Sequence, residues 1–154
     1  MKFELFNQKV ESWAEVRGIY EQSTENKQIL KFSEELGEYL IAETYQEKMD
    51  AIGDMAVCIV NANKFNDLPI NIIGSRYSNG IGDLCGFVKL RSYSAAIEQL
   101  MGVAYTASVK FEDCLEMAWN EIKDRKGMMI NGLFVKWENL TESQQEELQA
   151  RLDA

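Results

Sequence analysis

Acidic side chains recur at helical spacing in two neighbouring stretches, and they are the residues best suited to chemistry. Glu34, Glu35 and Glu38 share one flank of the first stretch, because positions three and four apart lie on one side of a helix. Asp50 and Asp54 share an arc of the second stretch, which is otherwise rich in apolar residues. Gathered carboxylates repel one another and lose solvation on burial, and a divalent cation relieves both costs.

The absence of histidine narrows the chemistry that these acids can support. With none in the sequence, Ser-His-Asp triads, His-ligated zinc and the Glu-x-x-His sites of di-iron bundles are excluded. Cys58, Cys85 and Cys114 are widely spaced and odd in number, which indicates neither a disulfide framework nor a zinc site. Oxygen-only ligands favour Mg²⁺, or Mn²⁺ in its place, over zinc or copper.

A solvated acidic face is the competing interpretation of the same pattern. Charged residues on the polar side of an amphipathic helix are ordinarily just hydrated. Against this, Asp50 and Asp54 stand in an apolar stretch rich in Met and Val, and acids recur on two successive predicted helices. From spacing alone both interpretations remain open.

Composition predicts a single all-α domain spanning residues 1–154. The sequence is 46% hydrophobic and 27% charged, which is typical of a globular protein. It has one proline, Pro69, and helical spacing predominates. A net charge of −9 disfavours a nucleic-acid polymer as partner. The N-terminus lacks a signal-peptide pattern and no membrane-length apolar run is present, so we expect a cytoplasmic protein without a membrane partner.

Apolar periodicity predicts six helices, over about residues 6–17, 24–43, 47–64, 80–90, 93–109 and 111–126. Ser23 or Thr24 can cap the second of these, and the turn at 66–69 ends the third. Residues 71–79 lack a clear pattern and are predicted to form a loop.

The C-terminal part carries the only strand signal. Asn131-Gly132 stands between two apolar runs and predicts a tight β-hairpin. Thr141, followed three residues later by Gln144, is typical of a capping box and predicts a polar terminal helix. The predicted fold is therefore a helical bundle with a short C-terminal hairpin.

The acidic stretches also carry a resemblance to a known family. Glu34-Glu35-Leu36-Gly37-Glu38 matches the E-E-x-x-E helix of MazG-like nucleotide pyrophosphohydrolases. The segment 50–54 (DAIGD) resembles the partner motif on the next helix of these enzymes, and 119–127 (WNEIKDRKG) is similar to their C-terminal nucleotide-binding segment. Order and spacing agree across all three motifs, and the resemblance as a whole spans about residues 10–136.

The resemblance implies an all-α MazG-type bundle that uses Mg²⁺ to hydrolyse nucleoside triphosphates, NTP or dNTP, to monophosphate and pyrophosphate. It implies Glu35, Glu38 and Asp54 as metal ligands, with Glu34 placed to activate water. Because relatives form dimers or tetramers, we expect a homodimer or homotetramer. The family often has Glu three residues before its final Asp, where this chain has Ala51. Asp50 or Glu47 could compensate as a ligand, and the number of metal ions is left open.

The C-terminal motif implies a set of substrate-binding residues. Asn120 would contact the base or sugar, and Lys123, Arg125 and Lys126 would bind phosphate oxygens, although each cation can equally serve as a helix C-terminal charge. Trp13 is predicted to pack in the core rather than stack on a base. The alternatives are a non-enzymatic helical interaction protein with a structural cation and a hydrolase specific for a modified nucleotide or an alarmone.

Overall fold

A computed structural model describes residues 1–74 and 80–154, and within them the chain is mostly helical, as predicted. Of the predicted loop, residues 75–79 lie outside the described part. None of the described helices is long and apolar enough to cross a membrane. The elements are α1 (Phe3–Val16), α2 (Ile19–Gln22), α3 (Glu25–Ile41), α4 (Tyr45–Lys64), α5 (Ile81–Lys89), α6 (Tyr93–Thr106), α7 (Phe111–Ile122), β1 (Gly127–Ile130), β2 (Leu133–Lys136), the 3₁₀ helix η1 (Trp137–Asn139) and α8 (Glu142–Asp153).

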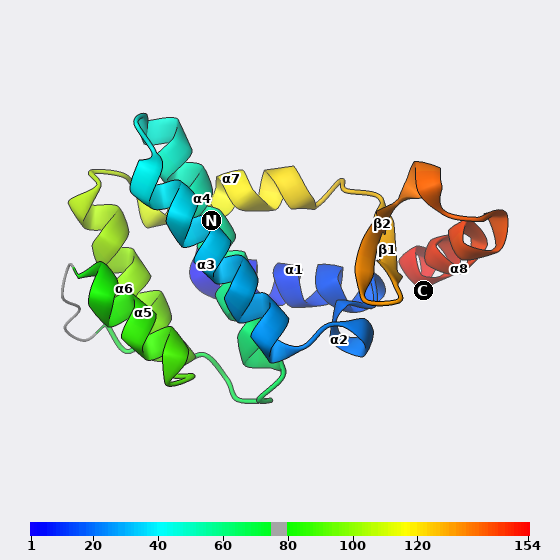
Figure 1. The fold of residues 1–154 in the computed structure, drawn as a ribbon, viewed down its shortest axis with the longest axis horizontal. Coiled ribbons are helices and arrows are strands. Elements are labelled where there is room, and N and C mark those ends of the chain that lie inside the picture. The colour runs from blue at the N-terminus through cyan, green and yellow to red at the C-terminus, as the bar shows by residue number, and fades with distance from the viewer. Residues whose placement is uncertain (75–79) are drawn as a thin grey trace.

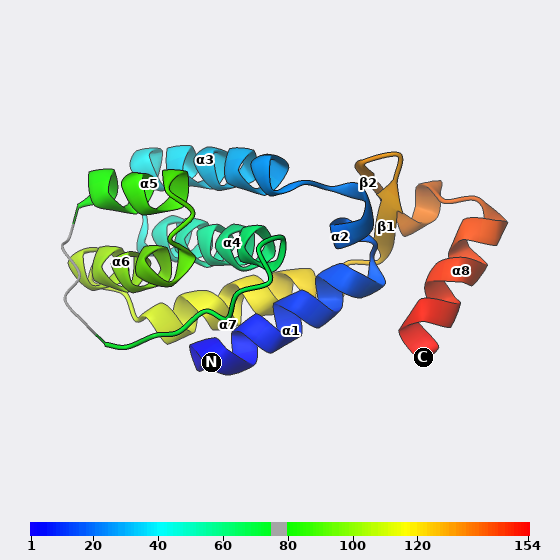
Figure 2. The same ribbon diagram turned by 90° about the horizontal axis from the view of Figure 1, so that it is seen from below.

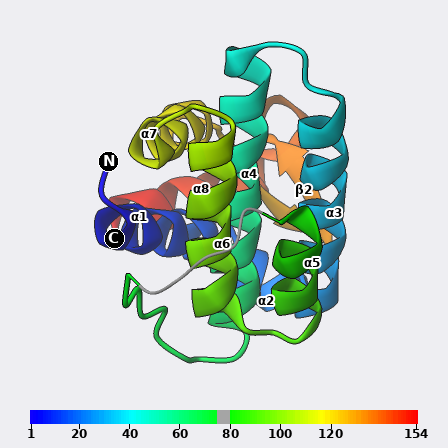
Figure 3. The same cartoon turned by 90° about the vertical axis from the view of Figure 1, so that its left-hand side faces the viewer.

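The long helices are stacked in three layers. Figures 2 and 3 show α3 and α5 in one outer layer, α4 and α6 in the middle, and α1 and α7 in the other outer layer. The central helix α4 packs against α1, α3, α6 and α7, and nearly all of its side chains from Ala51 to Asn63 are buried. A polar side chain on α4 therefore faces other protein elements more than bulk water.

Sequence signals explain where the two acid-bearing helices begin. The side chain of Thr24 caps α3 by accepting a hydrogen bond from the backbone N–H of Lys27, as the sequence predicted. At the start of α4, Thr44 and Glu47 form a reciprocal capping box. The short turn between the end of α3 and the start of α4 makes them adjacent antiparallel helices (Figure 2).

The predicted hairpin is present at the end of the molecule opposite α5 and α6 (Figure 1). β1 and β2 pair antiparallel, and Asn131 and Gly132 adopt φ of 50° and 79°, the two positive values of a type I′ turn. Gln22 of α2 attaches the hairpin to the bundle: its Nε2 donates to the carbonyl of Met129 at 2.9 Å, and its Oε1 accepts from the N–H of Gly132 at 3.2 Å.

The last predicted bundle helix ends earlier than expected. α7 stops at Ile122 rather than near Lys126. The guanidinium of the buried Arg17 donates two hydrogen bonds, of 3.1 and 2.9 Å, to the carbonyl of Arg125. This interaction holds the chain in a non-helical path between α7 and β1, so residues 124–126 belong to a connection rather than to a helical turn.

Helices α4 and α7 come into very close contact at Gly53. A Cβ added at Gly53 would lie 2.4 Å from the carbonyl oxygen of Cys114 and 2.8 Å from Cβ of Ala118. Heavy atoms that are not bonded cannot pack this closely. The glycine therefore permits an approach between the two helices that any other residue would prevent.

Gly53→Ala tests this contact, and Gly37→Ala is its matched control. Gly53→Ala should lower the free energy of unfolding by about 1–3 kcal/mol, because the added methyl forces α4 and α7 apart. A Cβ at Gly37 of α3 meets nothing within 4 Å, so Gly37→Ala should raise stability by about 0.5–1 kcal/mol through helix propensity. Urea denaturation measures both, and equal effects of the two variants would contradict the close approach.

Candidate metal centre and adjoining cavity

The fold brings together four of the five acids singled out in the sequence. We use the name acid cluster for Glu35 and Glu38 of α3 with Asp50 and Asp54 of α4. The charges of Glu35, Asp50 and Glu38 raise the pKa of Asp54, and those of Glu38, Asp50 and the neighbouring Glu34 raise the pKa of Glu35. Glu35, Asp50 and Asp54 are partly buried, whereas Glu38 and the fifth acid, Glu34, are exposed. A fully solvated acidic face does not describe this arrangement.

Burial is the main reason why the pKa values of Asp54 and Glu35 are raised. Loss of solvation raises the pKa of Asp54 to about 7, the charges of Glu35 and Asp50 add to the effect, and Arg125 opposes it. Burial likewise raises the pKa of Glu35, with Glu38 and Asp50 contributing. Without a bound cation, Asp54 is therefore about half protonated at neutral pH. A bound cation would favour its charged form.

One carboxylate oxygen of the cluster lacks any partner in the described structure. Oε2 of Glu35 is buried without a hydrogen-bond donor. A buried, unpaired carboxylate oxygen costs free energy unless a donor or a cation reaches it. The donor chemistry at this point consists of oxygens alone, which suits a hard divalent cation.

Glu121 of α7 joins the acids of α4, and it was not among the ligands predicted from the sequence. One carboxylate oxygen from each of Asp50, Asp54 and Glu121 lies within 4.8 Å of the other two. Two ligands of one Mg²⁺ ion lie at most about 4.2 Å apart. Small side-chain rotations would therefore bring these three oxygens to ligand spacing.

Glu47, the other residue considered as a replacement ligand, has a different role. Its Oε2 accepts hydrogen bonds of 2.9 Å from the backbone N–H groups of Glu43 and Thr44. These bonds lower the pKa of Glu47 and hold its carboxylate at the start of α4. Asp50, one turn further along α4, is the acid that lies beside Asp54.

A cavity of about 340 Å³ adjoins the acid cluster, and Glu35 and Asp54 line it. This volume is at the small end of the range for ligand sites. The rest of the wall comes from α1, α3, α4, the end of α7 and the hairpin, and much of it is apolar, including Trp13, Val57, Ile122, Met129, Leu133 and Phe134.

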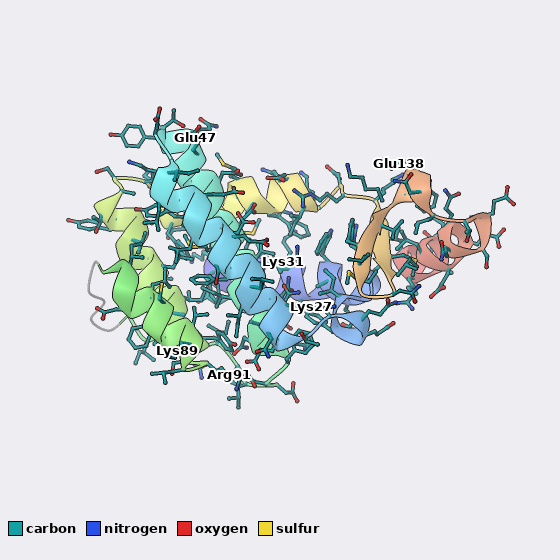
Figure 4. The ribbon with its side chains drawn as sticks, in the orientation of Figure 1. Lys27, Lys31, Glu47, Lys89, Arg91 and Glu138 are labelled. Carbon is teal, nitrogen blue, oxygen red and sulfur yellow. The ribbon has the colours of Figure 1, made fainter. Side chains whose placement is uncertain are left out.

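Two lysines that the sequence analysis did not assign to the site also line the cavity. Lys27 and Lys31 lie on α3 (Figure 4), eight and four residues before Glu35 respectively, so all three side chains follow one stripe of the helix. Lys27 reaches the hairpin, since a Cβ placed at Gly132 would lie 3.0 Å from its Nζ. The cavity is therefore positive toward the start of α3 and negative toward the acid cluster.

Arg125 is the one residue of the predicted substrate-binding set that lines the cavity. Its guanidinium forms an ion pair with Glu121, four residues before it in the chain. Nζ of Lys123 instead donates to Oδ1 of Asn120 at 2.9 Å, and both residues are exposed. Nζ of Lys126 lies 5.8 Å from the ring centroid of Trp137. Asn120, Lys123 and Lys126 do not line the cavity.

Trp13 combines the predicted core packing with a place in the cavity wall. It is partly buried against the core and stacks on Phe134 of the hairpin, with ring centroids 6.4 Å apart and planes at 21°. The guanidinium of Arg17 lies 4.7 Å from the centroid of the indole ring. These contacts hold the indole in a fixed position at the cavity.

Comparison of this chain with protein-family models, with curated proteins and with solved structures found no match. Function is therefore inferred from the acids, the cavity beside them and the sequence resemblance.

The raised pKa of Asp54 predicts that the metal-free protein becomes less stable as pH rises. The folded state keeps a proton on Asp54 up to about pH 7, whereas the ordinary pKa of an aspartate side chain is 3.8. Folding is therefore favoured at low pH and loses about 2–3 kcal/mol between pH 5 and pH 8. No histidine is present to obscure this window.

Urea denaturation in the presence of a chelator measures this pH dependence. Asp54→Asn should remove most of it, because the amide does not titrate, while the helical circular dichroism spectrum stays unchanged. Glu146→Gln, an exposed acid on α8, provides the control and should keep the slope of the parent. A parent protein whose stability increases from pH 5 to pH 8 would contradict the assignment.

Proposed function

We propose that this chain is a Mg²⁺-dependent nucleotide pyrophosphohydrolase, able to use Mn²⁺ instead, that converts nucleoside triphosphates to monophosphate and pyrophosphate. The observation that carries the proposal is the acid cluster at one end of a cavity whose other end bears two lysines. The resemblance of residues 34–38 and 50–54 to the MazG-like motifs supports the same reaction.

The chemistry of the cavity wall supports a nucleotide as the substrate class. Apolar and aromatic surface from Trp13, Met129 and Phe134 suits a planar base. Lys31 and Arg125 supply cations for phosphate oxygens, and Lys31 lies one turn from Glu35. A triphosphate with its own charge of about −4 could approach the acid cluster only with a cation between them.

The proposed reaction needs three tasks, which fall to different residues: binding the cation, activating water and binding phosphate. Glu35, Glu38, Asp50 and Asp54 would hold Mg²⁺, which supplies Lewis-acid stabilisation and orients water when bound. Glu34 would accept a proton from the attacking water. The water oxygen forms a bond to one phosphorus of the α–β bridge, and the bridge bond breaks to release pyrophosphate. Lys31 and Arg125 would bind the charge on the phosphate oxygens.

Product analysis with a panel of nucleotides tests the reaction. Incubation with Mg²⁺ and NTPs, dNTPs, modified nucleotides and alarmones should yield monophosphate and pyrophosphate from at least one triphosphate. Glu38→Gln and Asp54→Asn should each reduce kcat/KM by at least about 100-fold, since each removes a charged metal ligand and keeps the size of the side chain. Glu146→Gln on α8 should match the parent protein.

The outcomes separate the competing functions. Orthophosphate as the first product would reject the proposed bond cleavage. Cation binding without hydrolysis of any nucleotide would favour the interaction protein with a structural cation. Full activity in both Glu38→Gln and Asp54→Asn would restore the solvated-face interpretation.

Arg125 and Lys123 provide a comparison within one short segment. Arg125→Ala should raise KM about tenfold, because a charged hydrogen bond to phosphate contributes about 1.5 kcal/mol or more. Its carbonyl contact with Arg17 does not involve the deleted side chain. Lys123→Ala should change KM less, because Lys123 lies outside the cavity wall. Steady-state kinetics measures both, with Lys89→Ala on α5 as the control (Figure 4). A larger effect of Lys123→Ala would contradict this placement of the substrate.

A further inference from the structure

We propose that Glu121 of α7 is a direct ligand of the cation and replaces the acid that Ala51 does not provide. The centre would then be built by three helices, α3, α4 and α7. This inference rests on the proposed metal site, but it does not depend on which phosphate bond is cleaved.

The helix α4 alone offers few ligands. Asp50 and Asp54 are one turn apart, and Ala51, three residues before Asp54, presents only a methyl group and is 2% exposed. Glu47 is held by its capping hydrogen bonds at the start of the helix. A further carboxylate for this side of the centre therefore has to come from another element.

The contact between α4 and α7 brings that carboxylate into place. Gly53 lies between Asp50 and Asp54, and a Cβ at Gly53 would lie 2.8 Å from Cβ of Ala118. Glu121 follows Ala118 by three residues, which is about one helical turn. The point of closest helix approach is therefore next to the acids of both helices, and their carboxylate oxygens come within 4.8 Å of one another.

A second observation points to a ligand at the same place. The buried Oε2 of Glu35 has no hydrogen-bond donor, and the charge of Glu35 is the leading charge that acts on Asp54. Asp50, Asp54 and Glu121 thus lie together, and the unpartnered oxygen belongs to the α3 residue whose charge acts most strongly on Asp54. The chemistry that satisfies all of them is a divalent cation with oxygen ligands.

Without a bound cation, the positive charge that acts on Glu121 and Asp54 comes from Arg125. Its guanidinium pairs with Glu121, and its charge also acts on Asp54. A divalent cation bound between Glu121 and Asp54 would compete with this ion pair. Arg125, which lines the cavity, would then be available to phosphate. Glu121 would in this way link two events: when the divalent cation binds, the guanidinium of Arg125 becomes free to bind phosphate.

Titration with Mn²⁺ alone, followed by electron paramagnetic resonance, tests the assignment without requiring activity. Glu121→Gln should weaken Mn²⁺ binding by about 10–100-fold, while circular dichroism stays unchanged because Glu121 is exposed on its helix. Glu112→Gln is the matched control, since it removes an exposed charge from the same helix at the opposite end. It should bind Mn²⁺ as the parent does.

Salt separates ligation from simple charge attraction. In about 0.5 M KCl the Debye length is only about 4 Å, so an effect of Glu121 through space should shrink strongly, whereas loss of a direct ligand should persist. Parent-like Mn²⁺ affinity in Glu121→Gln, or a difference that vanishes in salt, would overturn the proposal.

The result is separable from the proposed function. Weak Mn²⁺ binding by Glu121→Gln together with an inactive parent protein would support the ligand and reject the hydrolase. Normal Mn²⁺ binding by Glu121→Gln together with pyrophosphate release by the parent would reject only the ligand. A parent protein that binds no Mn²⁺ would reject both.

Discussion

The backbone contact at Gly53 is the constraint on which the rest of the structure depends. It lets α7 approach the central helix closely enough for Cys114 and Ala118 to touch α4. Helices ordinarily pack with axes 8–10 Å apart, and small residues at the crossing allow the shorter spacings. The same crossing determines how α7 points toward the hairpin, and hence where the cavity wall begins.

The arrangement of charge follows from the position of α4 in the middle layer. A helix covered on several sides loses the solvent that would otherwise separate its carboxylates, so Asp54 becomes a weak acid and Glu35 keeps an unsatisfied oxygen. A packing preference alone would replace these acids with apolar residues, because buried like charges oppose folding. The cation proposed for this site would offset that cost.

Local sequence signals predicted the helices, the caps and the hairpin because each of these depends on residues close together in the chain. Periodicity also identified the acids of α3 and α4, which are joined by a short turn. It could not identify Glu121, whose partners lie about seventy residues earlier in the chain, or the cavity lysines, whose roles depend on the hairpin opposite them. The end of α7 was placed too late because a hydrogen bond from Arg17, distant in sequence, fixes the segment that follows it.

The cavity has two walls that are held in different ways, because Gln22 attaches the hairpin to the rest of the molecule. The acid side is built into the packed centre of the bundle, where most substitutions would disturb α4. The opposite wall is a four-residue strand pair and its turn, held by a few hydrogen bonds from α2. Substitutions in the hairpin can therefore change the shape of this wall while leaving the carboxylates untouched, so the form of the cavity and the charge at its acidic end can vary independently.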